Sequence, residues 1–134
     1  MHATTNPLKV WHKSIFDSDP SELLNILDDS FEFYSPAVFK SKEKYMGYIY
    51  LLAASQSFLT GDFKYTREII DEGQAVLEFE CTMGGVTVNG IDMFKWNNDN
   101  KLTEMKVMIR TEKALEAVKQ EMTKNLSRPE LWRR

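Results

Sequence analysis

The sequence GGVTVNGIDMFKWNNDNKLTEMKVMIRT occupies residues 84–111 and decides the fold. It contains two alternating runs of apolar and polar residues, 86–96 and 102–110, of the kind that β-strands favour. Between them lie Asn-Asn-Asp-Asn at residues 97–100, which tolerate turn and left-handed backbone conformations. The stretch therefore predicts a β-hairpin.

Asp92 lies in the middle of the first of these two strands. Because strand side chains alternate between faces, Asp92 shares a face with Phe94 and Trp96. Burial without a cationic partner disfavours a charged carboxylate and raises its pKa. Two interpretations follow. Asp92 is neutral and hydrogen-bonds a polar group of a ligand in a pocket, or it bonds to the Trp11 indole, to His12 or to a tyrosine hydroxyl and anchors the first helix.

The rest of the chain predicts helices placed around a meander of strands. Capping residues and helical periodicity predict helices at residues 7–16, 20–27, 41–58 and 112–125, the third capped by Ser41 and the second ended by Asp28 and Asp29. Alternation predicts further strands at residues 31–35, 63–70 and 75–83. Helices on one side of an antiparallel sheet make an α+β domain. Residues 1–6 and 127–134 are expected to be flexible tails of a single domain spanning residues 1–134.

Composition and charge exclude several classes of protein. The chain has 134 residues and a net charge of −3, without a basic stripe, so a nucleic-acid partner is not expected. It has no stretch of roughly 20 apolar residues, so no membrane partner is expected either. Cys81 is the sole cysteine and the first residues do not form a signal peptide. We therefore expect a cytoplasmic protein with Cys81 in its core.

The first helix carries the second residue of chemical interest. His12 falls on or beside the apolar stripe formed by Leu8, Trp11 and Ile15. It is either a histidine at the edge of the core or an acid or base in a pocket. No metal site is expected, because the other histidine is His2. The sequence has neither a glycine-rich phosphate loop nor a nucleophile elbow, and no cofactor is predicted.

The order of elements resembles the nuclear-transport-factor-2-like superfamily, which includes SnoaL-like polyketide cyclases, ketosteroid isomerases and limonene-epoxide hydrolases. The resemblance covers Pro7 to about Met122 and is carried best by residues 28–36, DDSFEFYSP, and 89–97, NGIDMFKWN. It implies a cone-shaped domain of cystatin-like topology. In such a cone, a curved antiparallel sheet wraps around helices and a pocket opens between them.

The ketosteroid isomerases allow a comparison residue by residue. Asp92, in the context Ile-Asp-Met-Phe, matches the aspartate that donates a hydrogen bond to the oxyanion in that family. Trp11 stands where that family has its tyrosine donor, and Ser35 stands where it has its general-base aspartate. A serine without a partner cannot replace a carboxylate as a base near pH 7, which argues against steroid isomerisation by that route. An epoxide-hydrolase site needs Asp-Arg-Asp, of which Arg67 and Asp92 would supply two members.

Two hypotheses about function follow. In the first, the cone binds a small hydrophobic molecule and carries isomerase, cyclase or hydrolase chemistry, with Asp92 as polar anchor and His12 as proton-transfer partner. The wall of its pocket would be formed by Trp11, Ser35, Tyr48, Tyr50, Phe79, Phe94 and Trp96. In the second, the pocket is filled and the domain is a non-catalytic module that forms a homodimer through its outer sheet face. That face carries Glu78, Glu80, Lys95, Glu104, Lys106 and Met108.

Overall fold

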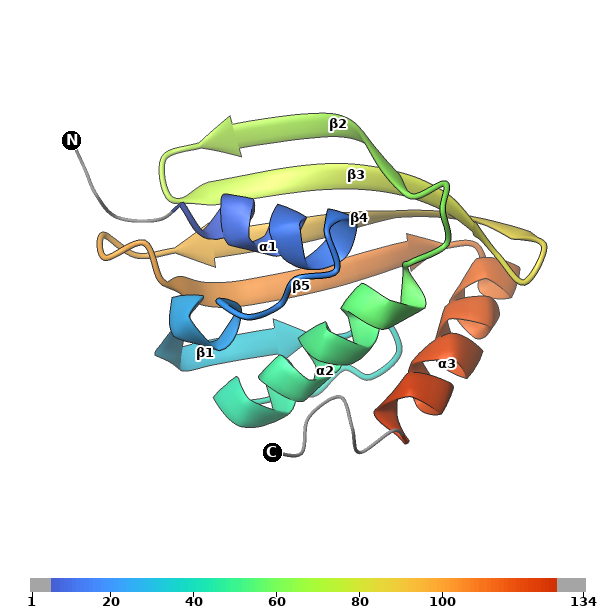
Figure 1. Cartoon of the computed structure of the whole chain (residues 1–134), viewed down its shortest axis with the longest axis horizontal. Helices are drawn as coiled ribbons and strands as arrows, with labels where there is room; N and C mark the ends of the chain where they lie inside the picture. The colour runs from blue at the N-terminus through green and yellow to red at the C-terminus, as the bar shows by residue number, and fades with distance from the viewer. Residues whose placement is uncertain (1–5, 128–134) are drawn as a thin grey trace.

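The computed structural model describes residues 6–127 (Figure 1). Its elements, in chain order, are α1 (Pro7–Phe16), η1 (Leu24–Ile26), β1 (Leu27–Tyr34), α2 (Lys44–Ser57), β2 (Lys64–Asp71), β3 (Gln74–Met83), β4 (Val86–Trp96), β5 (Leu102–Arg110) and α3 (Glu112–Leu126). Of the flexible tails predicted at residues 1–6 and 127–134, residues 1–5 and 128–134 lie outside the described residues. Asn6, the first described residue, caps α1 by accepting a hydrogen bond from the Leu8 amide. None of the described helices is long and apolar enough to cross a membrane.

The five strands form one curved sheet in the order β1-β5-β4-β3-β2. The strands β2 to β5 are an antiparallel meander, as predicted, and the β4–β5 hairpin places Asp92 opposite Val107. β1 runs parallel to β5, so the sheet is mixed where a purely antiparallel one was expected. Figure 1 shows the three α-helices on the same side of this sheet. The predicted α+β cone is confirmed.

The hydrophobic core lies between the helices and the inner face of the sheet. Its largest fully buried side chains include Trp11 of α1, Phe31 of β1, Phe79 of β3 and Phe94 of β4. The glycine at position 47 lets α2 approach β1 closely, since a Cβ atom there would lie 2.8 Å from the ring of Phe31. Aromatic side chains from α1, β1, β3 and β4 are thus the largest components of this core.

Two local predictions were wrong. In place of a helix over residues 20–27, the chain makes the short turn η1 and enters β1 at Leu27. Asp28 accepts hydrogen bonds from the amide and hydroxyl of Ser30, a local alternative to helical bonding. The cap of α2 is Glu43, whose carboxylate accepts from the Tyr45 and Met46 amides, instead of Ser41.

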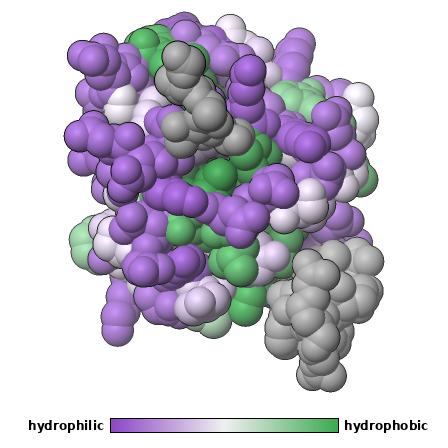
Figure 2. Space-filling model, turned by 60° about the vertical axis from the view of Figure 1, so that its left-hand side comes forward, coloured by the Kyte–Doolittle hydropathy of each residue, from purple (hydrophilic) through white to green (hydrophobic). Residues whose placement is uncertain are grey.

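Hydrophobic and hydrophilic residues are mixed on the surface of the protein. Figure 2 shows the side of the molecule on which the β2–β3 and β4–β5 turns lie, and hydrophobic residues gather near its centre among hydrophilic ones. Large apolar side chains are also exposed in the loop after β1 and on the edge strand β2. The most exposed is Phe39, at 101%.

Candidate functional site

A chain of three hydrogen-bonded side chains connects α1 to the sheet. The indole Nε1 of Trp11 donates to the hydroxyl of Tyr65 at 2.7 Å. That hydroxyl donates in turn to Oδ2 of Asp92 at 2.6 Å. The residues come from α1, β2 and β4, so the chain joins elements that are far apart in sequence. This is the anchoring geometry that the sequence left open for Asp92.

Burial controls the electrostatics of this chain. Asp92 is 4% exposed, and loss of hydration raises its pKa to about 7, although the hydrogen bond from Tyr65 acts in the opposite direction. The Tyr65 hydroxyl is also buried. Desolvation and the adjacent Asp92 carboxyl raise its pKa well above the ordinary value of 10. Tyr65 is therefore neutral at physiological pH, while Asp92 is near its midpoint.

His12 lies beside this chain but does not join it. Its ring packs edge-on against Tyr65, with centroids 5.4 Å apart, and against Phe16 at 5.9 Å. The Nε2 atom of His12 is buried and has no hydrogen-bond partner among residues 6–127. The side chain thus packs against Tyr65, the hydrogen-bond partner of Asp92, and its Nε2 atom makes no hydrogen bond to Asp92.

The other side chains proposed for a pocket around Asp92 belong mainly to the core. Trp11, Phe79 and Phe94 are fully buried, and the rings of Trp11 and Phe94 lie 6.3 Å apart. Tyr48 and Trp96 are partly buried and pack against the same core. Arg67 points to the outer face of the sheet, where its Nε lies 3.4 Å from Glu78. Its side chain therefore pairs away from Asp92.

A pocket of about 230 Å³ lies at another place, between α2, α3 and β5. Mainly apolar side chains form its wall: Phe33 from β1, Tyr50 and Ala54 from α2, Phe58 just after α2, Val107 and Ile109 from β5, and Leu115, Val118, Met122 and Leu126 from α3. The loop of residues 35–38 closes one side of it. Of the predicted ligand-binding residues, this pocket brings together Ser35 and Tyr50.

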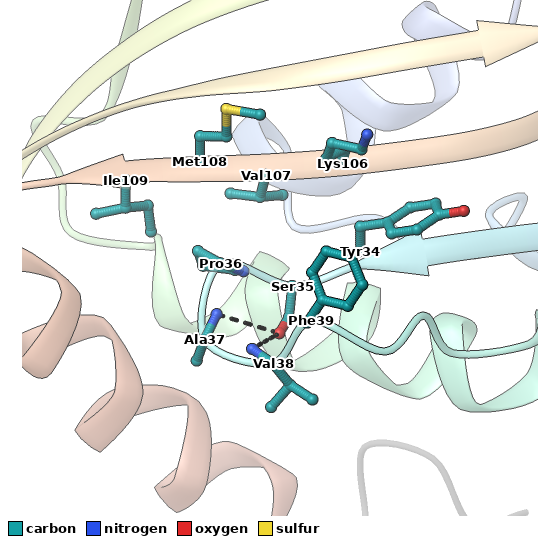
Figure 3. Close-up of a pocket in the computed structure, with 10 residues that line it drawn as sticks. All are labelled: Tyr34, Ser35, Pro36, Ala37, Val38, Phe39, Lys106, Val107, Met108 and Ile109. Atoms are coloured by element: carbon teal, nitrogen blue, oxygen red, sulfur yellow. Dashed lines mark hydrogen bonds between the residues drawn. The ribbon is translucent and has the colours of Figure 1, made fainter.

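Few polar groups line this apolar pocket. Besides the hydroxyl that Tyr50 carries, they are Ser35 on the loop and Lys119 and Thr123 on α3. The Ser35 hydroxyl already accepts hydrogen bonds from the amides of Ala37 and Val38, which hold the loop in its turn (Figure 3). Neither Asp92 nor His12 contributes to the lining.

On the other side of the same loop lies an open groove of about 530 Å³. Figure 3 shows Tyr34 and Phe39 next to the strand residues Lys106 to Ile109. β1 pairs with β5 only as far as Tyr34 opposite Lys106, so the rest of β5 borders this groove. The loop of residues 35–38, with Val107 and Ile109, is shared by the groove and the apolar pocket.

The sequence did not predict two features: the Tyr65 partner of Asp92 and the wall that α3 contributes to the apolar pocket. Tyr65, the direct partner of Asp92, lies in an alternating strand whose register the sequence does not reveal. The wall supplied by α3 could have been suspected from its apolar residues at helical spacing, Leu115, Val118 and Met122. Within residues 6–127, no group of three or more His, Cys, Asp and Glu side chains is placed to hold a metal ion.

Comparison by sequence gave no relatives, because no family model and no curated protein matches this chain. Solved structures do match. A steroid delta-isomerase from Pseudomonas aeruginosa is similar over 95% of this chain and 96% of its own, with a TM-score of 0.81 and 27% identity. An uncharacterised protein with a cystatin-like fold from Silicibacter pomeroyi covers 88% of this chain and 83% of its own, with a TM-score of 0.74 and 18% identity.

A third similar structure is that of a protein described as NTF2-like. It is an NTF2-like protein of unknown function from Cytophaga hutchinsonii, with a TM-score of 0.56 and 16% identity, covering 81% of this chain and 93% of its own. These likenesses concern the fold of the whole domain. The chain has the fold of NTF2-like proteins, the fold that the resemblance of its sequence to SnoaL-like and ketosteroid-isomerase-like domains implied.

Proposed function

We propose that this protein binds a small, mainly apolar molecule in the pocket between α2, α3 and β5. The observation that carries the proposal is the pocket of about 230 Å³, whose wall is almost entirely apolar. Ligand sites are typically concave and apolar, with a few polar groups that orient the ligand. Water gains little from such a surface, so an apolar ligand that displaces it is favoured by the hydrophobic effect.

Filling the pocket tests this proposal. Ala54 lies on its α2 wall, and Ala54→Leu places a larger side chain in the space that a ligand would occupy. Ala117→Leu is the matched control, because Ala117 is on α3 and does not line this pocket. Calorimetric titration with 1-decanol should show binding to the wild type and to Ala117→Leu, and at least tenfold weaker binding to Ala54→Leu. Equal affinity in all three proteins, or no binding to the wild type by decanol or by a panel of apolar carbonyl compounds, would refute the proposal.

Proton-transfer chemistry at Asp92 is a second candidate function. It is favoured by the buried carboxyl with a pKa of about 7, since a general acid or base works best when its pKa lies near the operating pH. The likeness to a steroid delta-isomerase also supports it. Asp92 would act as polar anchor and His12 as proton-transfer partner. A substrate would have to take the place of Tyr65 at Asp92 and displace aromatic side chains around it.

The test of this second function is turnover of a Δ5-3-ketosteroid and of lactone or epoxide substrates. Activity lost in Asp92→Asn and retained in Ala54→Leu would support chemistry at Asp92. Absence of turnover by the wild type on all three substrate classes would remove it. The two variants therefore separate the two candidate sites.

We further propose a homodimer through the outer sheet face. The side chains that would form it are on the outward faces of β3, β4 and β5, with Lys95 opposite Glu104 and with Met108 half exposed. Interspersed opposite charges around an apolar residue suit a two-fold interface. Sedimentation of the Lys95→Glu, Lys106→Glu double variant should show monomers, whereas an intact dimer would exclude this face.

A further inference from the structure

We propose that the molecule taken by the apolar pocket is a medium-chain monocarboxylate. Its hydrocarbon chain would lie between α2, α3 and β5, and its carboxylate would meet Lys119. This inference rests on the proposed function, and it adds the chemical class of the ligand. It is carried by the charges of the lining, which includes one cationic side chain and no acidic one among the described residues.

Lys119 is available for such a contact. Its ammonium lies 3.6 Å from Glu116 on the same helix, and the two side chains are 53% and 63% exposed. An exposed ion pair of this kind contributes little, so the ammonium can turn to a ligand carboxylate at small cost. Its long aliphatic stem can follow the apolar wall while the charge stays in water at the rim.

Thr123 supports the same end of the pocket. It lies four residues after Lys119, and residues at this spacing are neighbours on one face of a helix. Both line the pocket, so an ammonium and a hydroxyl occur together on the α3 side. On the opposite side, the Ser35 oxygen is engaged by the Ala37 and Val38 amides. The α3 rim is thus the place where a cationic side chain and a hydroxyl occur together and can hold an anionic head group.

The size of the pocket favours a single chain over a fused ring system. Its volume of about 230 Å³ is below the range of roughly 300–1,000 Å³ that is usual for drug-sized ligands. Its walls come mainly from two helices and a strand. Each methylene group that enters it should strengthen binding about fourfold, until the chain outgrows the pocket.

The experiment compares a carboxylate with a neutral ligand of the same chain length. Decanoate and 1-decanol are titrated below their aggregation limits into the wild type, Lys119→Glu and Lys124→Glu at low salt. Lys124 is a matched control, because it is also on α3, pairs with Glu121 at 3.3 Å and does not line the pocket. Circular dichroism confirms that all three proteins are folded.

We expect Lys119→Glu to weaken decanoate binding about tenfold and to change decanol binding less than twofold. The figure follows because an exposed ion pair changes an equilibrium constant by about fivefold at most, and charge reversal replaces attraction with repulsion. Lys124→Glu should leave both affinities within about twofold. Octanoate should bind more weakly than decanoate, and added salt should narrow the difference between wild type and Lys119→Glu.

The outcomes separate this inference from the proposed function. If decanol and decanoate both bind, and Lys119→Glu affects them equally, the pocket binds apolar ligands but carboxylate recognition at Lys119 is wrong. If Lys124→Glu weakens decanoate as much as Lys119→Glu does, the effect is one of general charge, and the inference is again overturned. If neither compound binds to the wild type, this inference fails, and the proposed function fails with it when the apolar carbonyl compounds do not bind either.

Discussion

The protein should become less stable as the pH rises, because of the buried carboxyl of Asp92. In the folded state its pKa is about 7, compared with 3.8 for an ordinary aspartate. Below pH 3.8 the group is protonated in both the folded and the unfolded protein and has no effect. Between these values the folded protein holds a proton that the unfolded protein has lost, so stability falls as the pH rises. Above pH 7 the loss is complete.

The size of this effect follows from the two pKa values. They differ by about three, and one pKa unit corresponds to about 1.4 kcal/mol, so the full loss is about 4 kcal/mol. The Tyr65 hydroxyl does not titrate in the same range, because its pKa lies well above 10. Replacement of Asp92 by asparagine removes the titration and keeps an oxygen that can accept the hydrogen bond from Tyr65.

Urea unfolding of the wild type and Asp92→Asn at several pH values measures the effect. Every other group titrates in both proteins, so their difference isolates Asp92. Between pH 4 and pH 8 the wild type should lose about 3–4 kcal/mol of unfolding free energy more than the variant does. Parallel pH profiles for the two proteins would refute the reasoning, since they would mean that the folded protein stabilises the carboxylate at this position.

Three further predictions concern single side chains. Tyr65→Phe removes the donor that lowers the pKa of Asp92, so that pKa should rise further by NMR titration, and unfolding free energy should fall by about 1–3 kcal/mol. Gly90→Ala should destabilise the protein by roughly 1–3 kcal/mol in urea unfolding, because the new methyl group would lie 2.5 Å from the backbone oxygen of Met108. Asp62 behaves in the opposite sense to Asp92: hydrogen bonds lower its pKa to about 2, so its contribution is present above pH 3.8 and lost as the pH falls toward 2. Asp62→Asn should therefore flatten the acid limb of the stability profile.

The local sequence pattern was sufficient to predict the positions of most strands in the sheet. The bounds of β4 and β5 agree with the two alternating runs, and the inward face of β4 carries Asp92 and Phe94 as their spacing predicts. Alternation works here because one face of the sheet is buried and a shift of one residue would expose it. The parallel pairing of β1 with β5 was not predicted. That pairing joins segments far apart in the chain, and neither segment carries a local mark of its partner.

The candidate site was harder to predict, because it too depends on contacts between segments that are far apart in the chain. A cluster of large aromatic residues in a sequence is compatible with a lined cavity and with a filled core. The choice depends on how the helices pack. Trp11 and Phe79 fill the space near Asp92, whereas the small side chain of Ala54 and the path of α3 leave a pocket elsewhere. The sequence therefore predicted the unusual acid correctly as an inward-facing group, but not its Tyr65 partner.

Asp92 and the apolar pocket are separate sites in this protein, and each would support a different function. Asp92 is buried and accepts a hydrogen bond from Tyr65. Its ionisation lowers the free energy of unfolding by about 4 kcal/mol. A buried acid that costs this much is more often found at functional sites than elsewhere, but ion pairs and structural networks also shift pKa values. The apolar pocket has no acidic side chain among the described residues of its lining and is already open in the structure. Ligand binding at the pocket and proton transfer at Asp92 therefore make different demands on the fold. A ligand that binds in the pocket should leave the pKa of Asp92 unchanged, whereas one that reaches Asp92 must replace the Tyr65 bond and change that pKa.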